Sequence, residues 1–305
     1  MSENIEKNSA IHDEVNLKEI ISALQQSKIL ILGIISLFTA SGIIYSLLTP
    51  QIWTSNALLT IAESEGASGG SSALGGLASI ASLGMGEGNI EGSKALATIR
   101  SREFFKHIVA FEEVLPNLMA AKGFDQANQK TVFDAGLYDV ESASWIQGKP
   151  STWLAYKAYR KSLQIILDSK TSFITISIEH RSPVFAQSFL ALLIREINSL
   201  SRERDLEQSE ASLQYLYQEL ESSKQADIRL AISQLIESQL KKQMLARVKS
   251  DYVLESLDAP YVPMERSRPQ RKNIVLIALF IGVFTSILFV LIRFYTLKNF
   301  NKFND

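Results

Sequence analysis

Two long apolar stretches without a charged residue stand near the two ends of the chain. Ile29 to Leu48 follows Lys28, and Ile274 to Ile292 lies between Lys272 and Arg293. A helix of about 20 apolar residues crosses the ~30 Å hydrocarbon core of a bilayer. The pattern therefore predicts two transmembrane helices, residues 29–48 and 274–292, rather than two buried helices of a soluble protein.

The first apolar stretch also has the position of a signal peptide. However, residues 1–28 carry three lysines against five acidic residues, and no small-residue cleavage motif follows the stretch. A secretory signal has a basic leader and a shorter apolar region. We therefore expect a retained anchor, preceded by a tail of residues 1–28.

The region between the two stretches, residues 49–273, is polar and holds most of the charged side chains. Two spans place both chain ends on one side of the membrane, with residues 293–305 as the second tail. Positively charged short tails favour the cytoplasmic side. The second tail carries Arg293, Lys298 and Lys302, although the basic residues within 266–272 crowd the opposite end of the span. We expect both termini in the cytoplasm and residues 49–273 on the far side.

Segments with strand patterns occur at both ends and in the centre of this polar region. In the clearest of them, Ile174, Ile176 and Ile178 alternate with polar residues, which is typical of a half-buried strand. The strands expected are Ile52–Ala62, Leu163–Asp168, Phe173–Glu179 and Val253–Leu257, of which the second and third form a hairpin.

Helix-start signals mark three further segments. Ser93 is expected to cap a helix that runs to about Phe111, and Ser151 is expected to cap another. Ser182-Pro183 combines a capping residue with proline at the first helical position, which is a strong start signal.

The third of these helices is expected to be long, over residues 183–250, because apolar residues recur at helical spacing and no Gly or Pro interrupts them. Some 65 helical residues would extend ~100 Å. A straight rod that begins near the membrane cannot also end near it, so the region either reverses as a hairpin or begins far out. Ser222-Ser223 is the favoured turn. The fold class expected is an α+β membrane protein with a membrane-proximal α/β base and a helical tower or hairpin.

A Gly/Ser-rich loop, residues 64–93, interrupts this regular pattern. Its composition disfavours fixed structure. Within the loop, Leu74, Leu77 and Ala78 keep a helical spacing, which indicates a short amphipathic segment.

The sequence offers little chemistry for a catalytic or metal site. It has no cysteine, its three histidines are far apart, and 31 basic residues balance 32 acidic ones, so no basic footprint for nucleic acid is present. No phosphate-binding loop motif occurs. A G-x-S-x-G match at 66–70 lies inside the Gly/Ser tract, where a chance match is expected. Acidic residues around Glu203 alternate with arginines, which indicates a solvated face. We expect no catalytic residue, metal or cofactor.

Two segments stand out for their geometry. Ala278, Gly282 and Ser286 are spaced four apart, which predicts a face for close helix packing in lipid, with Gly42 and Ser46 as a weaker counterpart. Before the second span, residues 259–272 form a proline-rich segment, which predicts a stiff, extended connector. Its marked residues are Pro260, Pro263, Pro269 and Arg271.

Several of these segments together resemble the chain-length determinant (Wzz) family, the polysaccharide co-polymerases of Gram-negative inner membranes. The segments are S-R-E-F-F at 101–105, F-I-T-I-S-I-E-H-R-S-P at 173–183, L-I-E-S-Q at 235–239 with Leu245-Ala246, L-G-G-L-A-S at 74–79, and the proline-rich segment. The resemblance covers nearly the whole chain, and the order of the segments makes it specific. The chain departs from many members in having only Gly282 as glycine in the final span.

The resemblance implies a non-catalytic regulator of the modal length of O-antigen lipopolysaccharide or a related surface polysaccharide. It implies a ring of identical protomers, an inner-membrane polymerase as partner, contact with membrane lipid, and residues 49–273 in the periplasm. On this basis we hypothesise that residues 64–93 face the ring interior or the membrane and touch the polymerase or the growing lipid-linked glycan.

Three other classes share part of this pattern. A membrane adaptor of a capsule or exopolysaccharide tyrosine-kinase system has the same topology, and its split version, with a separate kinase, stays open. A two-span sensory receptor needs a signalling module behind the second span. A glycan-acting enzyme needs convergent acid and base groups, which the sequence does not offer.

Overall fold

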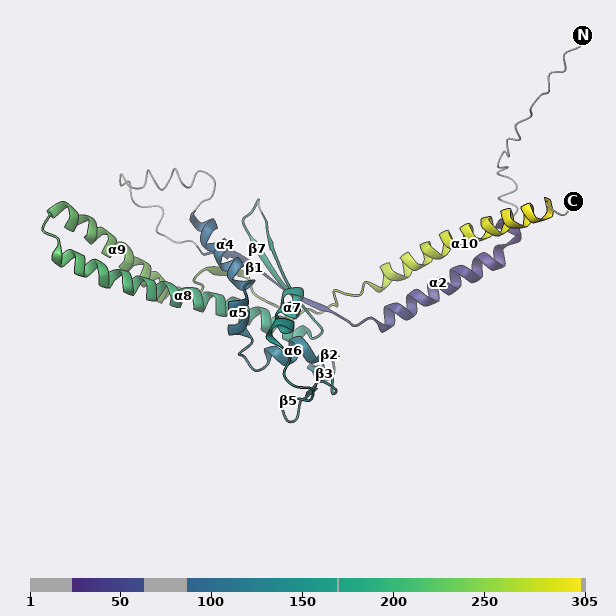
Figure 1. Cartoon of the computed structure of the whole chain (residues 1–305), viewed down its shortest axis with the longest axis horizontal. Helices are drawn as coiled ribbons and strands as arrows, with labels where there is room; N and C mark the ends of the chain where they lie inside the picture. The colour runs from purple at the N-terminus through teal and green to yellow at the C-terminus, as the bar shows by residue number, and fades with distance from the viewer. Residues whose placement is uncertain (1–23, 63–86, 169, 303–305) are drawn as a thin grey trace, which may run out of the picture. The chain divides into compact units, whose positions relative to one another are not determined.

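The computed structural model describes residues 24–62, 87–168 and 170–302 (Figure 1). The chain divides into two compact units. Unit 1 combines the residues up to Pro50 with those from Arg268 onward, and unit 2 comprises Gln51–Ser267. The polar middle of the sequence thus folds as a unit of its own.

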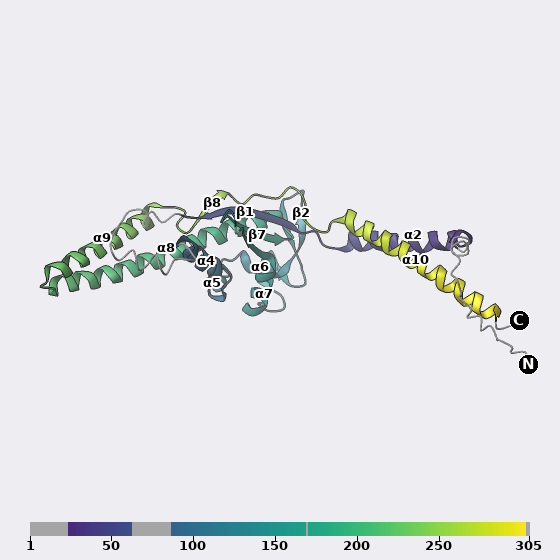
Figure 2. The same cartoon turned by 90° about the horizontal axis from the view of Figure 1, so that it is seen from above.

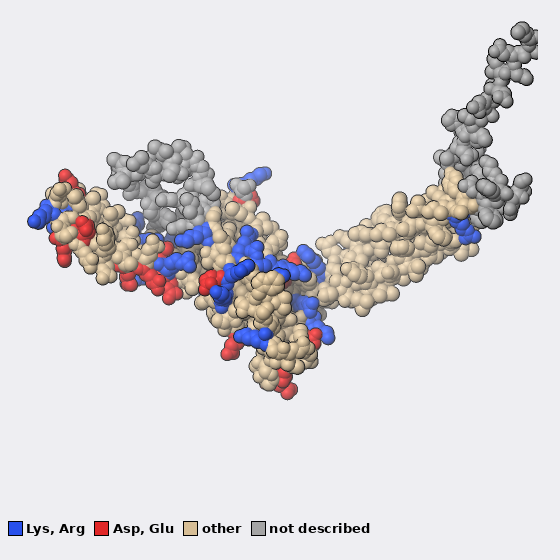
Figure 3. Space-filling model, viewed as in Figure 1, with Lys and Arg blue, Asp and Glu red and all other residues tan. Residues whose placement is uncertain are grey.

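Unit 1 consists of two helices that lie side by side, α2 (Lys28–Leu48) and α10 (Arg271–Lys302). Both are long and apolar enough to cross a membrane, α10 over Arg271–Thr296. Their apolar side chains point mostly outward, with Ile29 87% and Phe284 70% exposed. Figure 3 shows this pair as a nearly charge-free surface. Such exposure is unfavourable in water and is what a lipid environment accommodates.

The centre of unit 2 is an antiparallel four-stranded sheet with the order β6-β7-β1-β8. Its strands are β1 (Trp53–Ile61), β6 (Leu163–Leu167), β7 (Ile174–His180) and β8 (Leu254–Asp258). These bounds agree within a residue or two with the strands predicted from the alternating pattern, and β6 and β7 form the expected hairpin. Ile174, Ile176 and Ile178 are fully buried.

The core of unit 2 lies between this sheet and a layer of helices (Figures 1 and 2). The helix α8 (Pro183–Ser222) packs on β1 and β7, α4 (Glu87–Ile99) packs on β1, and α7 (Thr152–Ser162) packs on β6 and β7. The helices that precede α8 are α4 (Glu87–Ile99), α5 (Arg102–Ile108), α6 (Val114–Ala120) and α7 (Thr152–Ser162). Ser151 caps α7 as predicted, since its hydroxyl accepts a hydrogen bond from the Leu154 amide.

The single helix predicted from Ser93 to Phe111 is wrong. Ser93 lies inside α4, and α4 ends at Ile99. A second helix, α5, follows, with Ser101 as its N-cap in an extended backbone conformation. The Ser101 hydroxyl accepts a hydrogen bond from the Phe104 amide at 3.1 Å. The hydroxyl of the buried Tyr159 donates to the Ile99 carbonyl at 2.6 Å and so satisfies a carbonyl at the end of α4. A capping serine inside an apolar helical pattern was the signal for this break.

Residues 114–145 contain elements that the pattern of apolar and polar residues does not predict. Besides α6, these are two small hairpins, β2 (Ala121–Asp125) with β3 (Lys130–Phe133) and β4 (Tyr138–Asp139) with β5 (Ser144–Trp145). The strands β4 and β5 have only two residues each, and β2 contains Gly123, so none of these three gives a clear alternation of apolar and polar residues.

The long helical region reverses as a hairpin, in the place that the sequence favours. Helix α8 (Pro183–Ser222) ends at Ser222, and α9 (Ala226–Val248) returns beside it. Ser182 caps α8 through a hydrogen bond from the Phe185 amide to its hydroxyl at 3.3 Å. At 1.5 Å per residue, the 40 residues of α8 extend about 60 Å. The two helices pack through a small apolar cluster of their own: Leu213, Ile232, Ile236, Leu216 and Leu220.

Candidate functional site

The two helices of unit 1 approach each other closely at Gly42 and Gly282. A Cβ atom added at Gly42 would lie 2.5 Å from the Cβ of Ala278. A Cβ added at Gly282 would lie 3.1 Å from the Cβ of Phe38 and 3.2 Å from the Cα of Ile35. Glycine therefore permits a backbone separation at these two points that no larger residue allows without a shift.

The serines of the same stripes are also buried. Ser286 is fully buried and Ser46 is 3% exposed. The Ser286 hydroxyl donates to the Val283 carbonyl within its own helix at 2.8 Å. Ala278, Gly282 and Ser286 thus lie on the face of α10 that meets α2. That this face holds the spans together within lipid remains a prediction.

The proline-rich segment runs back along the first strand of unit 2. The Ser55 hydroxyl donates to the Tyr261 carbonyl at 2.8 Å, and the Ser267 amide donates to the Ile52 carbonyl at 2.9 Å. Pro263 is buried, and Pro260 and Pro269 are half-buried. Arg271 is the first residue of α10. A functional role remains a prediction for the four marked residues of this segment, Pro260, Pro263, Pro269 and Arg271.

The loop residues singled out from the sequence, Leu74, Leu77 and Ala78, lie outside the described residues. The predicted loop ends too late in the sequence, because α4 already begins at Glu87. Within that helix, a Cβ at Gly92 would lie 2.2 Å from the Cδ1 of Ile61. The last residues of the predicted loop therefore belong to the packed fold.

A hydrogen bond joins α5 to α8 on the surface of unit 2. The His107 Nε2 lies 2.8 Å from one oxygen of Glu196, and the Arg195 Nε donates to the other at 3.0 Å. Burial raises the pKa of Glu196, but these two hydrogen bonds outweigh it and leave the pKa below the usual value. The described residues contain no group of three or more His, Asp or Glu arranged to hold a metal.

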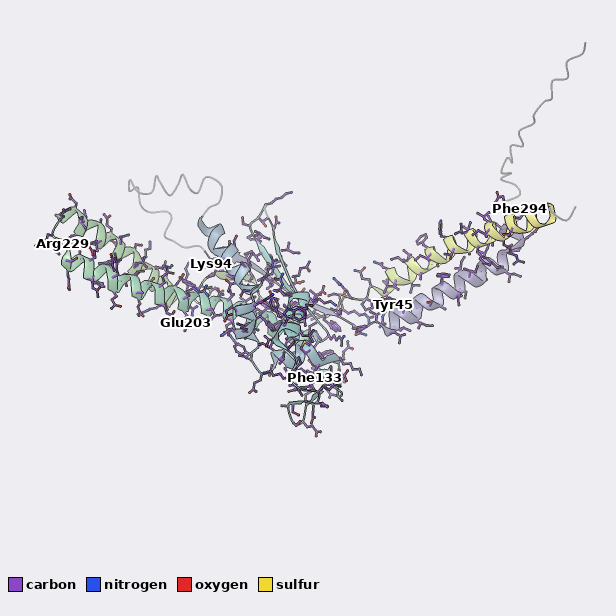
Figure 4. All side chains as sticks on the ribbon, viewed as in Figure 1. Tyr45, Lys94, Phe133, Glu203, Arg229 and Phe294 are labelled. Atoms are coloured by element: carbon purple, nitrogen blue, oxygen red, sulfur yellow. The ribbon has the colours of Figure 1, made fainter. Side chains whose placement is uncertain are left out.

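The charged part of α8 is mainly solvent-facing, as the alternation of Glu and Arg predicts. Glu203 is exposed on the hairpin (Figure 4). Asp205 differs from its neighbours because it receives a hydrogen bond from the Tyr252 hydroxyl at 2.7 Å and lies 3.3 Å from Lys242 Nζ. Asp205 therefore connects α8 with the C-terminal half of α9 through Lys242.

Two buried polar residues that the sequence does not mark as candidate site residues, Asn198 and His180, connect the elements of unit 2. Asn198 accepts hydrogen bonds from the Val253 and Leu254 amides and donates to the Leu254 carbonyl, each at 2.9 Å. His180 receives the Ser182 amide on Nδ1 at 3.0 Å, and its Nε2 lies 2.9 Å from the Asn117 carbonyl. These contacts require a neutral imidazole with its proton on Nε2.

The stability of unit 2 should therefore fall as the solution is acidified through the titration of His180. Burial lowers the pKa of His180 below the 6.5 of the unfolded chain. A depressed folded-state pKa means that the full contribution is present above pH 6.5 and is lost as the pH falls through the folded-state pKa. Thermal unfolding between pH 7 and pH 5 should show a smaller pH slope in His180→Gln than in the wild type. An equal slope in wild type and His180→Gln would contradict the prediction.

Comparison with known proteins shows similarity to one family over the N-terminal third of the chain. Residues 13–109 match the family model described as "Wzz: Chain length determinant protein". The matched range includes α2, β1 and the S-R-E-F-F segment, and it confirms the resemblance to the chain-length determinant family inferred from the sequence. A solved structure described as "full-length bacterial polysaccharide co-polymerase" is similar with a TM-score of 0.40 and 13% identity, covering 94% of this chain and 99% of that chain. None of the curated proteins matches the chain.

Proposed function

We propose that the protein is a non-catalytic regulator of polysaccharide chain length that acts on O-antigen lipopolysaccharide or a related surface polysaccharide. The observation that carries the proposal is the family match, which spans the first apolar helix and the first strand of unit 2. The second apolar helix, α10, lies outside the matched range and supports the proposal separately, because it gives the chain a second possible membrane span.

The proposed topology has α2 and α10 in the bacterial inner membrane, unit 2 in the periplasm and both termini in the cytoplasm. In this topology residues 1–28 and 293–305 are tails, 29–48 and 274–292 are the spans, and 49–273 form the periplasmic domain. The chain has no cysteine, so a single cysteine introduced at Ser222 reports the side on which the hairpin lies. Labelling of Ser222→Cys by a membrane-impermeant maleimide in intact spheroplasts supports this topology, and labelling only after lysis contradicts it.

The proposed working form is a homo-oligomeric ring that contacts the polysaccharide polymerase. The exposed apolar side chains of α9 support an oligomer. They are spaced four residues apart and are 41% exposed at Leu240, 68% at Met244 and 82% at Val248. Apolar side chains repeated on one helix face favour packing against another protein surface.

The length distribution of the surface polysaccharide tests the proposal directly. In cells that lack the protein, we expect the clustered bands of the lipopolysaccharide ladder to give way to an unregulated distribution, and the intact gene to restore the cluster. An unchanged ladder together with a loss of capsule would instead favour the tyrosine-kinase adaptor role.

A deletion confined to residues 64–86 should shift the modal length, because we propose that this loop touches the polymerase or the glycan. The deletion leaves α4 and Gly92 intact, whereas removal of the whole 64–93 segment would also damage the fold. The measurement is the lipopolysaccharide ladder at equal protein level in the membrane fraction. A ladder identical to that of the wild type would contradict a role for the loop.

A further inference from the structure

A hollow opens between α2 and α10 at the N-terminal end of α2. It has a volume of about 490 Å³ and is lined by Gln26, Ser27, Ile29, Leu30, Val290, Arg293 and Phe294. Figure 2 shows the two helices crossing and then separating toward the C-terminal end of α10, where Figure 4 labels Phe294. The hollow therefore lies at the open end of the helix pair, beyond the close contacts at the glycines.

The lining of this hollow is divided between polar and apolar groups. Gln26, Ser27 and Arg293 are hydrogen-bond donors, and within the described residues none of their side chains has a hydrogen bond or ion pair. The remaining residues are aliphatic or aromatic, and Val290 is only 2% exposed.

We propose that this hollow binds an anionic phospholipid, with its phosphate on Arg293, Ser27 and Gln26 and the start of an acyl chain against the apolar lining. An arginine guanidinium forms charge-assisted hydrogen bonds with phosphate, and hydroxyl and amide donors complete such a site. Basic pockets between membrane helices bind anionic headgroups on this principle. An unneutralised cation beside apolar side chains fits an amphiphile better than a free inorganic anion.

The proposal rests on the assignment of α2 and α10 as membrane spans. It does not depend on whether the protein acts in polysaccharide synthesis. A matched control is available in Lys28, which neighbours the hollow in sequence but does not line it. Arg293→Gln and Lys28→Gln remove the same charge from the same end of the helix pair. A site at Arg293 responds only to the first, whereas a general attraction of anionic lipid to basic residues responds to both.

The test is native mass spectrometry of the full-length protein released from nanodiscs of equimolar phosphatidylglycerol and phosphatidylcholine. We expect wild-type protein to retain phosphatidylglycerol preferentially and Arg293→Gln to bind it about tenfold more weakly, the effect of losing one charge-assisted hydrogen bond. The affinity of Lys28→Gln for phosphatidylglycerol should stay within about twofold of that of the wild type, because salt screens a charge that does not contact the lipid.

Three results would overturn the proposal: equal losses in the two variants, no lipid preference in the wild type, or full displacement of the lipid by millimolar inorganic phosphate. Incorporation of the wild type into nanodiscs of phosphatidylcholine alone tests the membrane assignment separately. A failure of lipid selectivity is thereby distinguished from a failure to enter the bilayer.

Discussion

Replacement of Asn198 by alanine is expected to destabilise unit 2 by about 3 kcal/mol, because three hydrogen bonds to the backbone of β8 are lost together. Asn198 is 3% exposed, and the Leu254 backbone that it serves is buried. Water therefore cannot replace the amide side chain at low cost, and the freed backbone groups keep most of their desolvation penalty.

The melting temperature of the full-length protein should fall by ~6–12 °C in Asn198→Ala, taking ~2–4 °C per kcal/mol for a unit of this size. Hydrogen exchange at the Val253 and Leu254 amides should accelerate as well. Ser199→Ala is the matched control, since Ser199 is exposed on the adjacent position of the same helix. The role assigned to Asn198 is wrong if the two variants melt at the same temperature.

Gly42→Ala is expected to push the two spans apart, whereas Gly33→Ala should leave them in place. The new Cβ at Gly42 meets the Cβ of Ala278 at 2.5 Å, and neither atom can rotate away. Gly33 has no atom within 4 Å of its added Cβ. Overpacking of this kind costs ~1–3 kcal/mol, while alanine at an open helix position is neutral or stabilising by up to ~1 kcal/mol.

A disulfide reporter measures this separation in membranes. Cysteines at Phe38 and Gly282 would have Cβ atoms about 3.1 Å apart, so that a small outward shift brings them into the ~3.5–4.5 Å range of a disulfide. Since the chain has no other cysteine, cross-linking under mild oxidation reports only this pair. We expect Gly42→Ala to slow the cross-linking of the Phe38→Cys/Gly282→Cys variant about tenfold. Equal rates with and without Gly42→Ala would show that the close approach does not exist in lipid.

The strands and the long hairpin were predictable because their signals are local. The isoleucines of β7 alternate over a whole strand, Ser182-Pro183 marks the start of α8, and Ser222-Ser223 interrupts an otherwise apolar periodicity. Each of these patterns follows from the geometry of a single element.

The parts that escaped prediction depend on contacts between distant segments. Asn198 is one polar residue in an apolar helical stripe, and nothing near it in the sequence names its partner at Leu254. The break between α4 and α5 is supported by Tyr159, which lies 60 residues beyond the carbonyl that it satisfies. The spacing of Ala278 and Gly282 predicts a packing face, but not that Gly42 lies opposite Ala278.

The hydrogen bond between Ser267 and Ile52 bears on the order in which the chain assembles. The partners α2 and α10 are far apart in sequence, and closing a long flexible loop carries an entropic cost that grows with its length. Once unit 2 has folded, its entry and exit points are neighbours, so that the unit behaves as a tight turn between the two helices. Pairing of the second helix with the first is then a nearly local event, even though all of unit 2 separates them in the sequence.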